Sequence, residues 1–143
     1  MTLEEWIKRY EEKTGDDFML PPGFTLYWLP NRGFAEYRYV DDILVVYQLC
    51  GDIHFWYDLA CLLCIQKGGV SVSTVCTCPI RPYLRLLGFK IREEYEENGK
   101  PRFICEDKLG RKVIATYRST DDTGCDTYFV SSYMSEMYGG NDG

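Results

Sequence analysis

A single histidine, His54, is the first residue whose chemistry suggests a catalytic role. It lies where a strand-like apolar segment gives way to a helical pattern. Imidazole has a pKa close to neutrality, so His54 is a candidate general base that would accept a proton from an amine. The alternative is a histidine at a helix start whose ring bonds only to nearby backbone, because the sequence fixes no second group beside it.

The cysteines are the second group with chemical potential. Their number is odd and most lie in apolar segments, which is typical of buried free thiols and not of a disulfide framework. The seven are Cys50, Cys61, Cys64, Cys76, Cys78, Cys105 and Cys125. Cys61 and Cys64 on a helix could meet Cys76 and Cys78 on a strand around zinc, but zinc-binding cysteines usually lie on turns. We therefore expect no metal, and no thioredoxin-like role for Cys61 and Cys64.

The elements that would position these residues follow from periodicity and turn chemistry. A capping box at Thr2 and Glu5 opens a helix that Gly15 ends. Helices are predicted at 2–13, 53–67 and 79–87, and strands at 24–29, 34–40, 43–49, 70–77, 89–95, 102–106, 112–117 and 127–133. We expect the strand at 43–49 to be central and covered on both faces, because its start is continuously apolar.

These elements predict one α+β domain over residues 1–138, followed by a frayed tail at 139–143. The sheet is expected to be mixed and mostly antiparallel, with a parallel strand-helix-strand-helix crossover in the centre. The predicted core residues are Val46, Leu59, Leu63, Val72 and Leu86.

Composition limits the classes of partner. A net charge of −6 disfavours nucleic acid, because the phosphate backbone attracts basic surfaces. No apolar run approaches the roughly 20 residues that span a bilayer, so we expect no membrane association and a cytoplasmic location. Aromatic residues make up 15% of the chain, which favours a sheet-rich fold.

The central block resembles the GNAT (N-acetyltransferase-like) superfamily. Its outline is a long apolar strand, a phosphate-facing loop, a helix, a strand and a short helix that ends in a Gly-Phe pair, here Gly88 and Phe89, before a hairpin. The resemblance implies that acetyl-CoA would bind at the loop Cys50, Gly51, Asp52 and Ile53, if any cofactor binds. Family members have further glycines there, whereas this loop has one glycine and an aspartate near the expected anion.

The family's general acid is also displaced. Many GNAT enzymes have a tyrosine four residues before the glycine of the Gly-Phe pair, where this chain has Leu84. Tyr83 is one place earlier, and on a helix that step turns the side chain by roughly 100°. If the protein is an acyltransferase, His54 and Tyr83 are the residues expected to handle protons.

A second resemblance is to short uncharacterised proteins of bacteriophages and prophages. It is based on the opening helix, on the turn at 29–34 and on the segment 46–56. This resemblance implies a phage or mobile-element protein in the host cytoplasm, but it implies no activity. Because the pyrophosphate loop and the expected tyrosine are missing, we expect the protein to act by binding a host or phage protein, without a cofactor. The alternative is an acyl-CoA-dependent N-acyltransferase with an altered pyrophosphate loop. The sequence leaves the oligomeric state open.

Two further groups of residues each allow two interpretations. The acidic residues at 41–42 and 93–97 form either a turn and a solvated strand end, or a surface that mimics nucleic acid toward a basic protein. The rings Tyr27, Trp28, Tyr37 and Tyr39 belong either to the core, which we favour, or to a contact patch.

Overall fold

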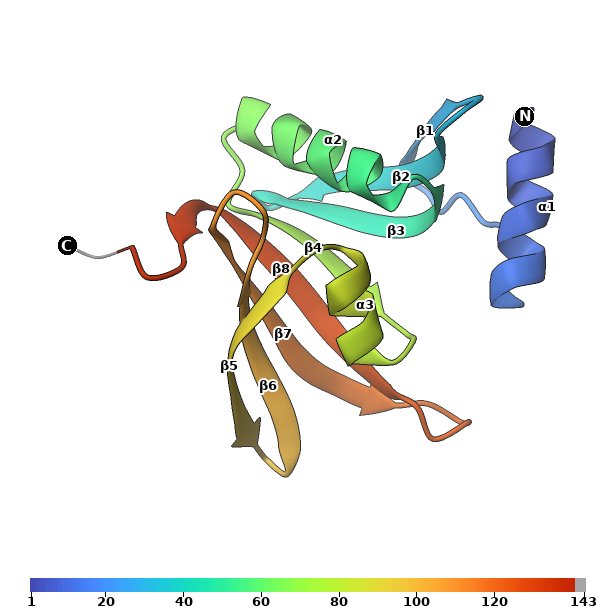
Figure 1. The fold of residues 1–143 in the computed structure, drawn as a ribbon. Coiled ribbons are helices and arrows are strands. Elements are labelled where there is room, and N and C mark those ends of the chain that lie inside the picture. Colours follow the sequence, from blue (N-terminus) through green and yellow to red (C-terminus); the bar gives the residue numbers. More distant parts are fainter. Residues whose placement is uncertain (141–143) are drawn as a thin grey trace. The chain divides into compact units, whose positions relative to one another are not determined.

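The computed structural model describes residues 1–140, and they form two compact units, each of which combines helices and strands (Figure 1). The first unit, residues 1–69, contains α1 (Leu3–Thr14), β1 (Thr25–Leu29), β2 (Gly33–Val40), β3 (Ile43–Gly51) and α2 (Ile53–Gln66). The second, from residue 70 onward, contains β4 (Ser71–Cys76), α3 (Ile80–Leu86), β5 (Lys90–Glu97), β6 (Lys100–Glu106), β7 (Arg111–Thr120) and β8 (Asp126–Met137). The α+β class is confirmed, and each predicted helix and strand is present with bounds shifted by a few residues.

Helix α1 begins and ends as its sequence predicts. The Thr2 hydroxyl accepts a hydrogen bond from the Glu5 amide at 3.1 Å, and the Glu5 carboxylate accepts one from the Thr2 amide at 2.7 Å. Gly15 closes the helix in the left-handed conformation, with φ 77°, and its amide donates to the Glu11 carbonyl. The capping box therefore satisfies two of the amides that a helix start leaves free.

One face of α1 covers part of the first sheet. The buried residues of this cluster are Trp6, Tyr10, Phe34 and Cys50, with Leu3, Ile7, Phe18 and Leu26 packed around them. The rings of Tyr10 and Phe18 both meet Phe34 edge-on, with centroids 5.6 and 5.3 Å away. The indole of Trp6 donates to the Pro30 carbonyl at 3.0 Å, which fixes α1 to the turn between β1 and β2.

Strands β1, β2 and β3 form an antiparallel meander. Asp41 and Asp42 make the turn between β2 and β3 with φ 47° and 66°, values that aspartate tolerates better than most residues. Helix α2 contacts β2 and β3. The buried Tyr37 hydroxyl donates to the Trp56 carbonyl at 2.6 Å and so joins this helix to the sheet.

The expectation that β3 is covered on both faces is wrong at two positions. Leu44 is buried, but Ile43 and Tyr47, which lie on the other face, are exposed. The Tyr47 ring lies beside Phe24, with centroids 5.8 Å apart, so its apolar body is partly shielded while its hydroxyl can reach water.

In the second unit the strand order is β4-β8-β7-β6-β5, with every neighbouring pair antiparallel. The last strand, β8, therefore lies between β4 and β7. Helix α3 contacts β5 and β8. The predicted parallel crossover would join strands of different units, and it stays a prediction, as does the single domain over 1–138.

The predicted core needs a correction at α3. Leu86 is 59% exposed, whereas Leu84 is fully buried and Leu87 is buried as well. A helix of seven residues buries only one narrow face, and Leu84 and Leu87, three residues apart, occupy it. Of the other predicted core residues, Val72 is buried, and Val46, Leu59 and Leu63 are partly buried.

The chain after β8 is described only to Gly140. The Gly140 amide donates to the Met137 carbonyl at 3.3 Å and closes a turn. The rest of the predicted frayed tail, residues 141–143, lies outside the described residues. Between residues 1 and 140, none of the helices has the length and apolar character needed to cross a bilayer.

Candidate functional site

The loop from Cys50 to Ile53 ends β3 and begins α2, as predicted. Gly51 has φ 106°, and a Cβ there would lie 2.2 Å from the Arg32 carbonyl oxygen. The Asp52 amide donates to that same carbonyl at 2.8 Å. Gly51 is thus required by the close approach of the loop to Arg32 and Gly33, whatever the loop binds.

The carboxylate of Asp52 occupies the start of α2. Its Oδ1 accepts a hydrogen bond from the Phe55 amide at 3.1 Å, and its Oδ2 lies 2.5 Å from Nη1 of Arg32. The bond from the Phe55 amide, and then the one from Arg32, lower the pKa of the Asp52 carboxyl. A pyrophosphate could bind at this helix start only if the Asp52 carboxylate turned away. Instead, that carboxylate points toward the helix amides and itself provides the negative charge that a helix start favours.

Aromatic side chains close the same region. Trp56 is 1% exposed, and its indole N–H donates to the Arg32 carbonyl at 2.8 Å. The Phe55 ring lies edge-on to Trp56, with centroids 4.9 Å apart, and the Arg32 guanidinium lies 4.7 Å from the Phe55 centroid. Arg32, Asp52, Phe55 and Trp56 therefore form one contacting group, which we call the α2 cap cluster.

The two candidate proton-transfer residues have different surroundings. His54 is exposed at the first turn of α2. Tyr83 belongs to α3 in the second unit, where it is partly buried, and this burial raises the pKa of its hydroxyl. Leu84, where the GNAT resemblance led us to look for a tyrosine, is fully buried in the second unit.

A buried carboxylate that sequence reasoning missed lies on β2. Glu36 is 0% exposed, and within residues 1–140 neither of its carboxylate oxygens has a hydrogen-bond partner. Burial raises the pKa of Glu36 to about 7. The register between β2 and β3 shifts between Ala35 and Tyr37, and residues 34 to 37 are all buried. For this reason the usual alternation of buried and exposed residues along a strand does not show on which face Glu36 lies.

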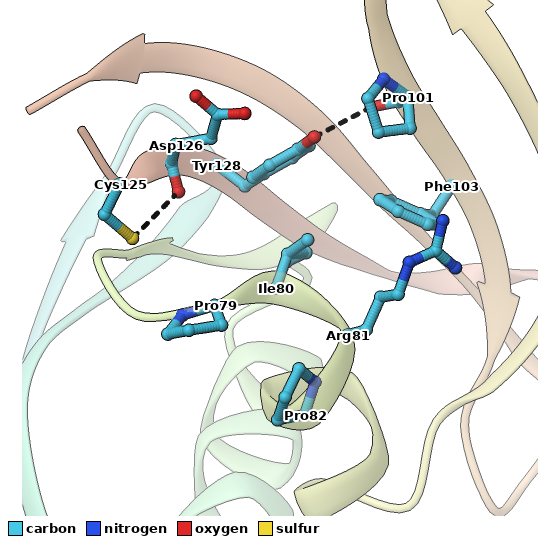
Figure 2. A pocket seen from close by; sticks show the side chains of 9 residues that line it. All are labelled: Pro79, Ile80, Arg81, Pro82, Pro101, Phe103, Cys125, Asp126 and Tyr128. Carbon is cyan, nitrogen blue, oxygen red and sulfur yellow. Dashed lines mark hydrogen bonds between the residues drawn. The ribbon is translucent and has the colours of Figure 1, made fainter.

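The second unit contains a pocket of about 320 Å³ that the sequence did not predict (Figure 2). It is lined by Pro79, Ile80, Arg81, Pro82, Pro101, Phe103, Cys125, Asp126 and Tyr128. The Tyr128 hydroxyl donates to the Pro101 carbonyl at 3.1 Å, and the Arg81 guanidinium lies 4.9 Å from the Phe103 ring centroid. Rings and proline faces, together with one arginine and one aspartate, thus make a small, mainly apolar site.

The cysteines divide into two kinds. Cys50, Cys61, Cys64, Cys76 and Cys105 are buried, as predicted, while Cys78 is exposed and Cys125 is partly exposed. Cys61 and Cys64 lie on α2 in the first unit, and Cys76 and Cys78 lie in the second. Among the described residues, no group of three or more His, Cys, Asp or Glu side chains is arranged to hold a metal ion.

The acidic residues of β5 are partly engaged within the second unit. Glu94 pairs with Arg81, and Glu93 accepts a hydrogen bond from the Tyr138 hydroxyl at 2.8 Å. Two of the carboxylates that were candidates for a charged contact surface therefore have internal partners.

Comparison of the chain with protein-family models and with curated proteins found no match.

Proposed function

We propose that this chain is a GNAT-like protein that acts by binding another protein, and that it does not use acyl-CoA. The observation that carries the proposal is strand β1, which lies at the edge of the first unit's sheet with an uncharged sequence. An edge strand presents unpaired backbone groups that can pair with an extended segment of a partner.

The two sheet edges of the chain differ in composition. Strand β5 has Lys90, Arg92 and four glutamates, which are charges that discourage strand addition. Strand β1 has no charged residue, and Trp28 is 39% exposed beside the exposed Leu29. A tryptophan at an open edge can supply the large apolar contact that dominates many protein interfaces. An extended segment with apolar side chains is the partner chemistry that fits.

Of the four aromatic residues considered as a contact patch, Trp28 is the one that supports this role. Tyr37 is buried and bonded to α2, and Tyr27 packs against it with ring centroids 5.2 Å apart. Tyr39 is partly buried, and its hydroxyl lies 3.5 Å from the Lys67 carbonyl oxygen.

The α2 cap cluster argues against the acyltransferase alternative. A CoA pyrophosphate needs free amides at a helix start, but the Phe55 amide already donates to Asp52, and Arg32 pairs with that carboxylate. A bound pyrophosphate would have to displace Asp52 or share the helix start with a second negative group.

The assignment to a GNAT-like fold is supported by the order of elements along the chain. Strand β3, helix α2, strand β4 and helix α3 follow one another, and α3 ends just before Gly88 and Phe89. The proposed phage or mobile-element origin, and with it action in the host cytoplasm on a host or phage protein, is based on sequence resemblance alone.

Two measurements test the proposal. Calorimetric titration with acetyl-CoA and with free CoA should give no heat of binding up to millimolar ligand, and micromolar binding of either would contradict it. Peptides selected for binding from a library of extended segments should lose at least tenfold in affinity for Trp28→Lys, because a charge enters the apolar contact.

The matched control for Trp28→Lys is Tyr95→Lys, which changes an exposed aromatic residue on the other edge strand. The peptides should bind this variant like the wild type. Hydrogen exchange of the β1 amides should also slow when a peptide is bound. Equal binding to wild type and Trp28→Lys, with β1 exchange unchanged, would rule out β1 as the contact.

A further inference from the structure

Two thiols meet at the end of β4 in the second unit, and a third lies against the backbone between them. Cys76 Sγ lies 3.5 Å from Cys78 Sγ and 3.2 Å from the Cys78 carbonyl oxygen. Cys125 Sγ lies 3.7 Å from the carbonyl oxygen of Thr77, the residue between them. Cys78 is exposed, Cys125 is partly exposed and Cys76 is buried. The chain thus places one accessible thiol in direct contact with a protected one.

We propose that Cys76 and Cys78 form a redox-active dithiol that exchanges with low-molecular-weight disulfides, with Cys78 as the attacking residue and Cys76 as the resolving residue. This activity is independent of the proposed protein binding at β1.

The environments of the thiols assign these roles. The hydrogen bond from Cys76 lowers the pKa of the Cys78 thiol, whereas that bond and then burial raise the pKa of Cys76. Burial, followed by the charge of Asp121, raises the pKa of Cys125. Since the thiolate is the nucleophile, the accessible Cys78 is the thiol that reacts first.

The reaction balances with a disulfide R–S–S–R as the oxidant. The Cys78 thiolate attacks one sulfur, a bond forms between Cys78 and that R–S group, and the other R–S⁻ leaves and takes up a proton. Cys76 then loses its proton and attacks Cys78 Sγ, which releases the second R–S⁻. The two cysteines lose two protons and two electrons in total, and the disulfide takes them up to become two thiols.

Geometry favours the second step. The two sulfurs must approach from 3.5 Å to the roughly 2 Å of a disulfide bond, which a shift of the short Thr77 segment can provide. Because both thiols belong to one tripeptide, the attack of Cys76 on the mixed disulfide at Cys78 is intramolecular. It should therefore be faster than attack on the same mixed disulfide by a thiol from solution.

The adjacent pocket offers a place for the R group. Pro79, directly after Cys78, and Cys125, against Thr77, both line it (Figure 2). Its volume of about 320 Å³ lies at the lower end of the range for small-ligand sites, so it suits a small disulfide.

The test uses the full chain, fully reduced, with oxidised glutathione as the probe at pH 7.5. Peptide mass spectrometry should show the peptide that contains Cys76 and Cys78 losing two hydrogens before any other cysteine is modified. Cys78→Ser cannot form the internal disulfide, and attachment of glutathione to its Cys76 should be at least tenfold slower than modification of the wild-type peptide. Cys76→Ser should stop at the mixed disulfide, with one glutathione retained on Cys78.

Cys50→Ser is the control, because it removes a thiol of the first unit that belongs neither to the dithiol nor to the pocket, and its rate should stay within about twofold of wild type. Near-ultraviolet circular dichroism identifies variants that fail to fold. The proposal is overturned if folded Cys78→Ser reacts as fast as wild type, or if Cys125 is modified before Cys78. It is also overturned if Cys76→Ser retains no glutathione.

Discussion

The guanidinium of Arg32 and the carboxylate of Asp52 form an ion pair at the start of α2, with Nη1 and Oδ2 2.5 Å apart. The same carboxylate accepts a hydrogen bond from the Phe55 amide. The helix start is therefore stabilised by an anion that the chain itself provides. Two side chains 20 residues apart thus occupy the helix start that the sequence suggested as a pyrophosphate site.

Asp52 should contribute to stability as a helix cap. Asp52→Ala is expected to lower the free energy of unfolding by about 1 kcal/mol, because the Phe55 amide loses its acceptor. Asp52→Asn keeps an oxygen at that position and should lower the free energy of unfolding by only a few tenths of a kcal/mol. Urea denaturation of the three proteins checks this, and equal losses in both variants would show that charge, not capping, is the source.

Gly51 should be intolerant of a side chain. A Cβ there would lie 2.2 Å from the Arg32 carbonyl oxygen in a backbone with φ 106°, so Gly51→Ala should cost about 3 kcal/mol. The control is Gly68→Ala, which has φ 71° and no neighbour within 4 Å, and it should cost about 1 kcal/mol. Thermal unfolding that ranks the two variants in the opposite order would contradict this account of the loop.

Glu36 should make stability depend on pH near neutrality. Its pKa is about 7 when folded, above the 4.5 of an ordinary glutamate, so between these values the folded state binds more protons than the unfolded one. The free energy of unfolding should fall as pH rises from 5 to 8, by roughly 2 kcal/mol after allowance for relaxation. Below pH 4 Glu36 makes no difference, because it is protonated in both states.

The control for this prediction is Glu36→Gln, which has a similar shape and does not titrate. Its free energy of unfolding should change less than that of the wild type over the same pH range. Chemical denaturation at each pH gives both curves, and parallel curves would mean that Glu36 does not carry the effect.

The two leucines of α3 should differ sharply. Leu84 is fully buried, so Leu84→Ala should destabilise the protein by about 3 kcal/mol, within the range for interior leucines. Leu86→Ala on the exposed face should change stability by less than about 0.5 kcal/mol. Similar losses at both positions would show that the orientation of α3 is wrong.

Local signals in the sequence determined the secondary structure. The capping box at Thr2 and Glu5, the left-handed Gly15 and the Asp41-Asp42 turn each act within a few residues, through bonds that the backbone forms with its immediate neighbours. For this reason the helices and strands could be placed from the sequence to within a few positions. Periodicity also predicted that a helix starts at residue 53, whereas the interest of the loop from Cys50 to Ile53 came from the GNAT resemblance.

The arrangement of side chains was decided by tertiary structure. The ion pair of Asp52 with Arg32 spans 20 residues, and the burial of Glu36 depends on an irregular register between two strands. The contact of Cys125 with Thr77 spans 48 residues. Residue type and spacing cannot reveal such contacts, because they depend on how the strands align and which backbone atoms the fold brings together. The sequence by itself thus determined the elements and the candidate loop, while packing decided that an internal carboxylate occupies the loop and that Cys125 lies against the backbone between Cys76 and Cys78.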